Sequence, residues 1–139
     1  MENIIKGYQK SRPLENLTLL VVEDDLSSAR LLKTLLKKYI NQVNHVLNGE
    51  DAIAYCQENP HVQIILMDIK MPGIDGLETT RRIRTFNKDV VIIAQTAYAL
   101  DGDKEKALQA GCNDYISKPI NKVELLTKLE SLASAVVSQ

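Results

Sequence analysis

The 139-residue sequence predicts a single α/β domain in which helices cover both faces of a parallel β-sheet. Short runs of apolar, often β-branched residues recur along the chain, and each has the length of one buried strand. Segments with a helical spacing of apolar residues separate these runs. No internal repeat or low-complexity tract competes with this alternation, which is typical of parallel sheets.

The central strand is the clearest of five expected strands. Residues 64–67 are all apolar, which is typical of a strand buried on both faces. Asp68 stands at the end of this strand. Pro72, Gly73 and Gly76 then turn the chain, because proline fixes φ and glycine accepts positive φ. The other four strands are expected over residues 17–22, 41–47, 90–96 and 115–117.

Apolar spacing predicts five helices, over about 28–39, 50–59, 77–86, 101–110 and 121–136. Ser27 or Ser28 is expected to cap the first helix, and Leu31 is expected to widen its apolar stripe. The last helix has Asn121 and Glu124 at capping spacing. Four of its residues are expected to face the core: Val123, Leu126, Leu129 and Leu132.

Right-handed crossovers leave few arrangements for such a sheet. We expect the strand order 2-1-3-4-5 of the doubly wound, flavodoxin-like fold. The folded domain is expected to span residues 17–136. Residues 1–16 are polar, contain Pro13 and show no clear period, so we expect a linker or tail there.

Composition excludes several kinds of function. A formal net charge of −1 argues against nucleic-acid binding, which needs a clustered positive excess. No apolar run approaches a membrane span and no signal-peptide core is present, so we expect a cytoplasmic domain without membrane contact. Cys56 and Cys112 are far apart and are expected to be free thiols. His45 and His61 lack partners at metal-ligand spacing and are interpreted as structural.

Polar residues stand at the carboxyl ends of four expected strands, where open α/β sheets bind ligands. They are Glu23 and Asp24 after the first strand, Asp68 after the third, Thr96 after the fourth and Lys118 after the fifth. Three carboxylates close together repel one another, and an all-oxygen set of this kind suits Mg²⁺. The metal and Lys118 would neutralise the oxygens of an incoming phosphoryl group, and Thr96 offers a hydroxyl donor. With Asp68 as nucleophile, the sequence predicts a site that accepts a phosphoryl group.

Four motifs carry a resemblance to a known family: VVEDD at 21–25, MDIKMPGIDG at 67–76, Thr96-Ala97 and Lys118-Pro119. Together they resemble the receiver (response regulator) domain of two-component signal transduction, over nearly the whole chain. The resemblance implies that Asp68 takes a phosphoryl group from a phosphohistidine on a histidine kinase or histidine phosphotransfer protein. It also implies a set of Mg²⁺ ligands: Asp24, Asp68 and the backbone carbonyl of Lys70, with Glu23 acting through water.

The resemblance implies roles for the residues around Asp68 as well. Lys118 would pair with Asp68 and then with a phosphoryl oxygen, the backbone amide of Ala97 would meet another oxygen, and the Lys118–Pro119 bond would be cis. Thr96 would move toward the phosphoryl group, and Tyr115 would swing inward. The altered surface would comprise the fourth helix, the fifth strand and the fifth helix, where a downstream protein or a second copy docks.

Two further positions bear on the lifetime of the phosphorylated state. Lys70 lies two residues after Asp68, and Tyr98 lies two residues after Thr96. In receivers these positions flank the path of the hydrolytic water. Neither side chain is a carboxylate or carboxamide that would align water, so we expect a comparatively long-lived acyl phosphate.

Several readings of the chain's context stay open. Residues 96–104 and 111–120 resemble receivers of hybrid sensor histidine kinases, which favours a receiver excised from such a chain over a stand-alone single-domain regulator. We expect no enzymatic activity beyond self-phosphorylation and self-dephosphorylation. An aspartate-nucleophile phosphatase is a distant alternative, because Ile69 and Lys70 leave no second aspartate as general acid. A receiver-like domain that is never phosphorylated and a mononucleotide-binding flavodoxin relative are disfavoured.

Overall fold

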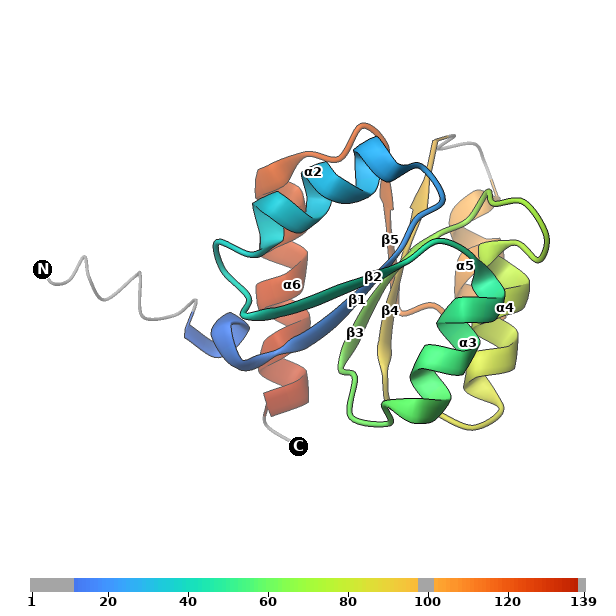
Figure 1. Cartoon of the computed structure of the whole chain (residues 1–139), viewed down its shortest axis with the longest axis horizontal. Helices are drawn as coiled ribbons and strands as arrows, with labels where there is room; N and C mark the ends of the chain where they lie inside the picture. Colours follow the sequence, from blue (N-terminus) through green and yellow to red (C-terminus); the bar gives the residue numbers. More distant parts are fainter. Residues whose placement is uncertain (1–11, 98–101, 138–139) are drawn as a thin grey trace, which may run out of the picture.

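Five parallel strands form the sheet, in the order β2-β1-β3-β4-β5 (Figure 1). They are β1 (Thr18–Val22), β2 (Gln42–Val46), β3 (Ile64–Asp68), β4 (Val91–Thr96) and β5 (Asp114–Ser117). The computed structural model describes residues 12–97 and 102–137. The strand order and the parallel pairing confirm the predicted doubly wound, flavodoxin-like fold.

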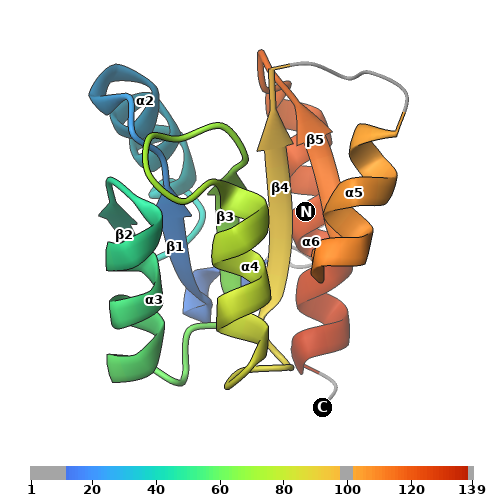
Figure 2. The same cartoon turned by 90° about the vertical axis from the view of Figure 1, so that its right-hand side faces the viewer.

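Helices cover both faces of this sheet (Figures 1 and 2). They are α2 (Leu26–Leu36), α3 (Gly49–Glu58), α4 (Gly76–Arg84), α5 (Asp103–Ala110) and α6 (Lys122–Val137). Helices α2 and α6 lie on one face, and α3, α4 and α5 lie on the other. None of the helices in the described part of the chain is long and apolar enough to span a bilayer.

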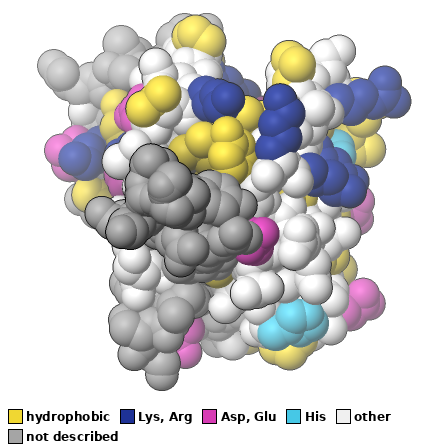
Figure 3. Space-filling view, turned by 90° about the vertical axis from the view of Figure 1, so that its left-hand side faces the viewer, with side chains coloured by type: hydrophobic (Ala, Val, Ile, Leu, Met, Phe, Trp, Pro, Cys, Tyr) yellow, Lys and Arg dark blue, Asp and Glu magenta, His cyan; other side chains and the backbone are white. Residues whose placement is uncertain are grey.

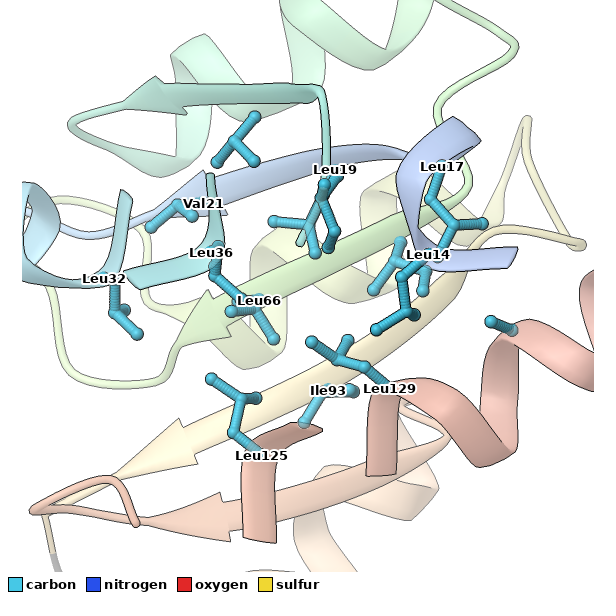
Figure 4. Packing of buried hydrophobic residues seen from close by; sticks show 14 of the residues in the cluster. Leu14, Leu17, Leu19, Val21, Leu32, Leu36, Leu66, Ile93, Leu125 and Leu129 are labelled. Carbon is cyan, nitrogen blue, oxygen red and sulfur yellow. The ribbon is translucent and has the colours of Figure 1, made fainter. Parts of the chain in front are cut away.

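Two hydrophobic cores result, one on each face of the sheet. The first core joins the sheet to α2 and α6 through residues such as Leu36, Leu66 and Leu129 (Figure 4). The second core joins the sheet to α3, α4 and α5, and it contains both free cysteines, Cys56 and Cys112. Because the central strands are buried on both faces, their sequences are nearly continuous apolar runs.

The expected tail at residues 1–16 is partly wrong. Arg12–Asn16 forms a short 3₁₀ helix, η1, which contacts α6. Leu14 is only 1% exposed and belongs to the first core. The sequence did not predict this element, because a single leucine among polar residues forms no helical or strand pattern. Residues 1–11 lie outside the described part of the chain, so the expectation of a tail stays a prediction there.

Two helices differ in detail from the expectation. Asp25, rather than Ser27 or Ser28, caps α2, and its carboxylate accepts a hydrogen bond from the Ser28 backbone N–H at 2.9 Å. Leu31 and Val123 are 73% and 71% exposed, so neither joins the core as predicted. The buried line of α6 instead consists of Leu125, Leu129 and Ala133. Asn121 caps α6 as expected, accepting from the Glu124 backbone N–H at 2.9 Å.

Candidate functional site

The alternation of side chains along the strands decides which face each site residue joins. Four polar residues lie two positions after a member of the first core: Glu23, Asp68, Gln95 and Lys118. These four therefore continue the face that α2 and α6 cover. Thr96 and Tyr115 lie on the other face, in line with Ala94 of the second core. The site thus straddles the carboxyl edge of the sheet.

Three carboxylates meet at this edge. Each of Glu23, Asp24 and Asp68 offers one oxygen, and these oxygens all lie within 4.8 Å of one another. Glu23 is 1% exposed and Asp68 is 4% exposed, whereas Asp24 is open to solvent. Crowded carboxylates of which two are buried suit an oxygen-seeking divalent cation, so the residues present fit the Mg²⁺ that the sequence predicts.

Lys118 faces the two buried carboxylates. Its ammonium Nζ donates a hydrogen bond to Glu23 Oε1 at 3.0 Å and lies 3.4 Å from Asp68 Oδ1. The Lys118 backbone N–H also donates to the Thr96 carbonyl at 2.7 Å, and the Lys118–Pro119 bond is cis, as expected. The strand ends therefore bring together the residues that the sequence analysis grouped.

The pKa shifts of Asp68 and Lys118 follow from this geometry. Burial and the neighbouring charge of Glu23 raise the pKa of Asp68 to about 7, and the Lys118 ammonium opposes this rise only in part. Burial lowers the pKa of Lys118, but its hydrogen bond to Glu23 and the charge of Asp68 outweigh that effect and leave the pKa raised. Without a cation, the site therefore carries more negative charge than Lys118 neutralises.

The backbone around the acidic residues is firmly held. The Glu23 N–H donates to the Val46 carbonyl at 3.2 Å, and the Asp25 N–H donates to Glu23 Oε2 at 3.2 Å. The ring Nε2 of His45 lies 2.9 Å from the Glu23 carbonyl oxygen, which makes that nitrogen the donor. His45 was interpreted as structural, and the parallel register that sets it opposite Val21 gives it this supporting contact.

The loop that follows Asp68 returns close to its own start. The Gly76 N–H donates to the Ile69 carbonyl at 2.8 Å. A Cβ atom at position 76 would overlap the backbone oxygen of Asp68, so only glycine fits there. The turn predicted from Pro72, Gly73 and Gly76 therefore closes directly over the strand that carries Asp68.

The remaining predicted residues differ in their exposure. Thr96 is buried at 5% exposure, Ala97 and Lys70 are exposed, and Tyr115 is half-buried against the second core. Tyr98 lies outside the described residues. The contacts expected of the Lys70 carbonyl, the Ala97 amide and the Thr96 hydroxyl concern a bound metal or phosphoryl group, and they stay predictions.

One site residue was missed by the sequence analysis. Gln95 is fully buried, and neither polar atom of its carboxamide has a hydrogen-bond partner among the described residues. It lines a groove of about 680 Å³ together with Lys118, Glu23 and apolar residues of α2 such as Leu35. Figure 3 shows this side of the molecule, where hydrophobic side chains lie among Lys and Arg side chains. The available signal was a single amide side chain in an otherwise apolar run.

Comparison with known proteins agrees with this arrangement. Residues 19–130 match the family described as response regulator receiver domain. The chain is a receiver domain. Its carboxylates and lysine occupy the strand ends where the sequence motifs of the receiver family predicted them.

Relatives of this receiver occur in proteins of very different length. A 110-residue stretch is 42% identical to hybrid signal transduction histidine kinase I of Dictyostelium discoideum, and it covers 73% of this chain but 6% of that kinase. A 116-residue stretch is 32% identical to the polar-differentiation response regulator DivK of Brucella ovis, and it covers 82% of this chain and 94% of DivK.

A solved structure gives the same picture of the fold. The receiver domain of Saccharomyces cerevisiae Ssk1, crystallised with the histidine phosphotransfer protein Ypd1, superimposes with a TM-score of 0.81 at 31% identity. The match covers 87% of this chain and 91% of that chain. Receivers therefore occur both within hybrid kinases and as downstream regulators.

Proposed function

We propose that Asp68 accepts a phosphoryl group from a phosphohistidine of a partner protein and that the domain then acts as a signalling switch. A carboxylate oxygen of Asp68 attacks phosphorus, the phosphorus–nitrogen bond to the donor histidine breaks, and the imidazole leaves after taking a proton. The product is an acyl phosphate on Asp68. The single observation that supports this proposal best is the Lys118 ammonium beside two buried carboxylates.

The acidic residues would hold Mg²⁺ for this reaction. Asp24, Asp68 and the Lys70 backbone carbonyl would bind it directly, and Glu23 would act through water. When bound, the cation neutralises charge on the oxygens of the transferring group. Because it also relieves the repulsion between Glu23 and Asp68, it favours the ionised, nucleophilic form of Asp68.

Other groups of this receiver would contact the phosphoryl group and change the conformation of the site. Lys118 would leave Glu23 and pair with one phosphoryl oxygen, while the Ala97 amide would donate to another. Thr96 would move toward the phosphoryl group, and Tyr115 would fill the space behind it. Two pre-existing arrangements of this edge would then exchange population, because only one of them contacts the phosphoryl group.

The switched surface would be the face formed by α5, β5 and α6, which are the predicted fourth helix, fifth strand and fifth helix. An ion pair spans it, with Lys128 Nζ of α6 3.1 Å from Asp114 Oδ2 of β5. A downstream protein or a second copy would dock there. The phosphodonor would be a histidine kinase or a histidine phosphotransfer protein, as in the Ypd1 complex of the related receiver.

The chain's context is a separate question. We favour a receiver excised from a hybrid sensor histidine kinase over a stand-alone regulator. The reason is that this chain is 42% identical to the matched stretch of the Dictyostelium kinase and 32% identical to that of DivK. A cytoplasmic setting without nucleic-acid contact is proposed along with it. Phosphotransfer rates from candidate kinases and phosphotransfer proteins would identify the donor.

Incubation with Mg²⁺ and acetyl phosphate tests the proposed function directly. Intact-mass measurement should show the addition of one phosphoryl group to the wild-type protein and none to Asp68→Asn. Asp89→Asn is the matched control, because Asp89 is an exposed aspartate on the loop before β4. Undiminished labelling of Asp68→Asn, or equal labelling in the presence of EDTA, would refute the assignment.

A further inference from the structure

Gln95 occupies a position next to the phosphoacceptor. In the parallel register of β3 and β4, Gln95 is the partner of Asp68, and in that of β4 and β5 it is the partner of Ile116. Lys118 lies two residues beyond Ile116, so alternation carries Asp68, Gln95 and Lys118 on the same face of the sheet. The carboxamide therefore belongs to the row of side chains that forms the site.

This carboxamide lowers the stability of the resting protein. Gln95 is fully buried, and both its Nε2 and its Oε1 lack a partner among residues 12–97 and 102–137. A buried amide without hydrogen bonds has lost its hydration and gained nothing in return. Residues 91–94 of the same strand are all apolar, so a hydrophobic side chain would fit the local pattern better.

Lys118 is the group that can supply the missing partner. An ammonium carries three N–H donors, and the contacts of Lys118 use two acceptors, Glu23 Oε1 at 3.0 Å and Asp68 Oδ1 at 3.4 Å. Lys118, Glu23 and Gln95 line the same groove, of about 680 Å³. The lysine therefore has room to exchange one oxygen acceptor for another within this space.

We propose that Gln95 is a positioning residue for Lys118, an inference that rests on the proposed function of Asp68. When Glu23 turns toward Mg²⁺, the Lys118 ammonium loses its nearest acceptor. The Gln95 Oε1 then accepts a hydrogen bond from Lys118 and keeps the ammonium directed at the phosphoryl oxygens. The Oε1 of this amide, which is unsatisfied in the resting state, gains a partner in the phosphorylated state, and this biases the equilibrium toward that state.

Gln95→Met tests this inference, because methionine keeps the length of glutamine and removes the amide. Its thermal unfolding midpoint should equal or exceed that of the wild type, since a buried unsatisfied group is lost. Its rate of phosphorylation by acetyl phosphate should nevertheless fall about threefold to tenfold, the effect of one hydrogen bond. If Gln95 had a purely structural role, the substitution would lower both the unfolding midpoint and the phosphorylation rate, or it would lower neither.

Ile93→Met is the matched control, because Ile93 lies on the same strand and face within the first core. It should change the unfolding midpoint and leave the phosphorylation rate within about twofold of the wild type, because no hydrogen bond is removed. Wild-type protein that takes no phosphoryl group would refute the proposed function and this inference with it. If the wild-type protein takes a phosphoryl group and the Gln95→Met variant is phosphorylated equally fast, the proposed function stands and the role of Gln95 is refuted.

A structure gives an answer that does not depend on the variants folding. In crystals of the wild-type protein with Mg²⁺ and beryllofluoride as a phosphoryl mimic, Gln95 Oε1 should lie about 2.7–3.2 Å from Lys118 Nζ. A separation above about 4 Å in that complex, with Lys118 on the mimic, would overturn the assignment.

Discussion

The side-chain nitrogen of Lys118 lies 3.4 Å from Oδ1 of Asp68, although the two residues belong to the ends of strands that are not adjacent in the sheet. Strand β4 runs between them, and Glu23 completes the contact from β1. This relationship makes the proposed phosphoacceptor, Asp68, depend on side chains from three strand ends, and it leads to the first prediction.

Lys118→Met should abolish most phosphorylation, because it removes the ammonium that lies beside Asp68 and that we propose pairs with the phosphoryl group. We expect the rate with acetyl phosphate to fall at least about 100-fold, as for other preorganised charge donors. Lys128→Met is the control, because Lys128 pairs with Asp114 away from the acidic cluster. A rate within about tenfold of wild type for Lys118→Met would contradict this role.

The stability of the metal-free domain should depend on pH through Asp68. Burial and Glu23 raise its pKa from the ordinary 3.8 to about 7, so the folded state holds this proton more tightly than the unfolded state. The stabilising contribution is complete below about pH 4 and is lost as the pH rises through about 7. Its size is on the order of 2–4 kcal/mol.

Mg²⁺ should reverse that loss, because we propose that it binds the ionised carboxylates. Chemical unfolding at pH 5.5 and pH 8 should show a larger stabilisation by Mg²⁺ at the higher pH. Asp68→Asn should be more stable than the wild type at pH 8 without metal and should lose this pH dependence. A Mg²⁺ effect that is equal at both pH values would contradict the assignment of the titrating group.

The lifetime hypothesis predicts that Lys70→Asn combined with Tyr98→Glu accelerates dephosphorylation about 100-fold, the low end of what a positioned base contributes. Loss of the phosphoryl group can be followed by intact mass after acetyl phosphate is removed. Lys88→Asn is the control for lysine removal, because Lys88 is exposed on the loop before β4. An unchanged rate in the double variant would show that neither side chain limits access of water.

The burial of Leu14 predicts that η1 contributes to the stability of the domain. Leu14→Ala should lower the free energy of unfolding by about 2–4 kcal/mol, because a fully buried leucine leaves a cavity. Leu31→Ala, at 73% exposure on α2, should change it by less than about 0.5 kcal/mol. Urea unfolding of the two variants compares them directly, and equal effects would mean that η1 is not part of the folded unit.

Much of the architecture was predictable from the sequence for a physical reason. Parallel strands buried on both faces must be apolar throughout, so the continuous apolar runs at residues 64–67 and 90–94 predict strands although they show no alternating pattern. The carboxyl ends of parallel strands meet at one edge, which is why the sequence alone groups Asp68 with Lys118. The confirmed strand order follows from the same reasoning.

The parts that escaped prediction depend on tertiary packing. Leu31 has the helical spacing of a core residue yet is exposed, whereas Leu14 stands in a stretch without any period yet is buried. In α6, Leu125 faces the core and Val123 does not, and the apolar spacing of the helix alone did not decide between them. The contact of His45 with the Glu23 carbonyl required the β1–β2 register to be known.

Strand β4 presents Gln95 to one face of the sheet and Thr96 to the other. One peptide bond joins the two residues, so a backbone movement at either position is passed to the other. We therefore expect substitutions at these neighbours to be non-additive: a change in the groove beside α2 would alter how readily the opposite face rearranges. In this receiver, the loading of the site and the reading of its state would thus be coupled through a single backbone link.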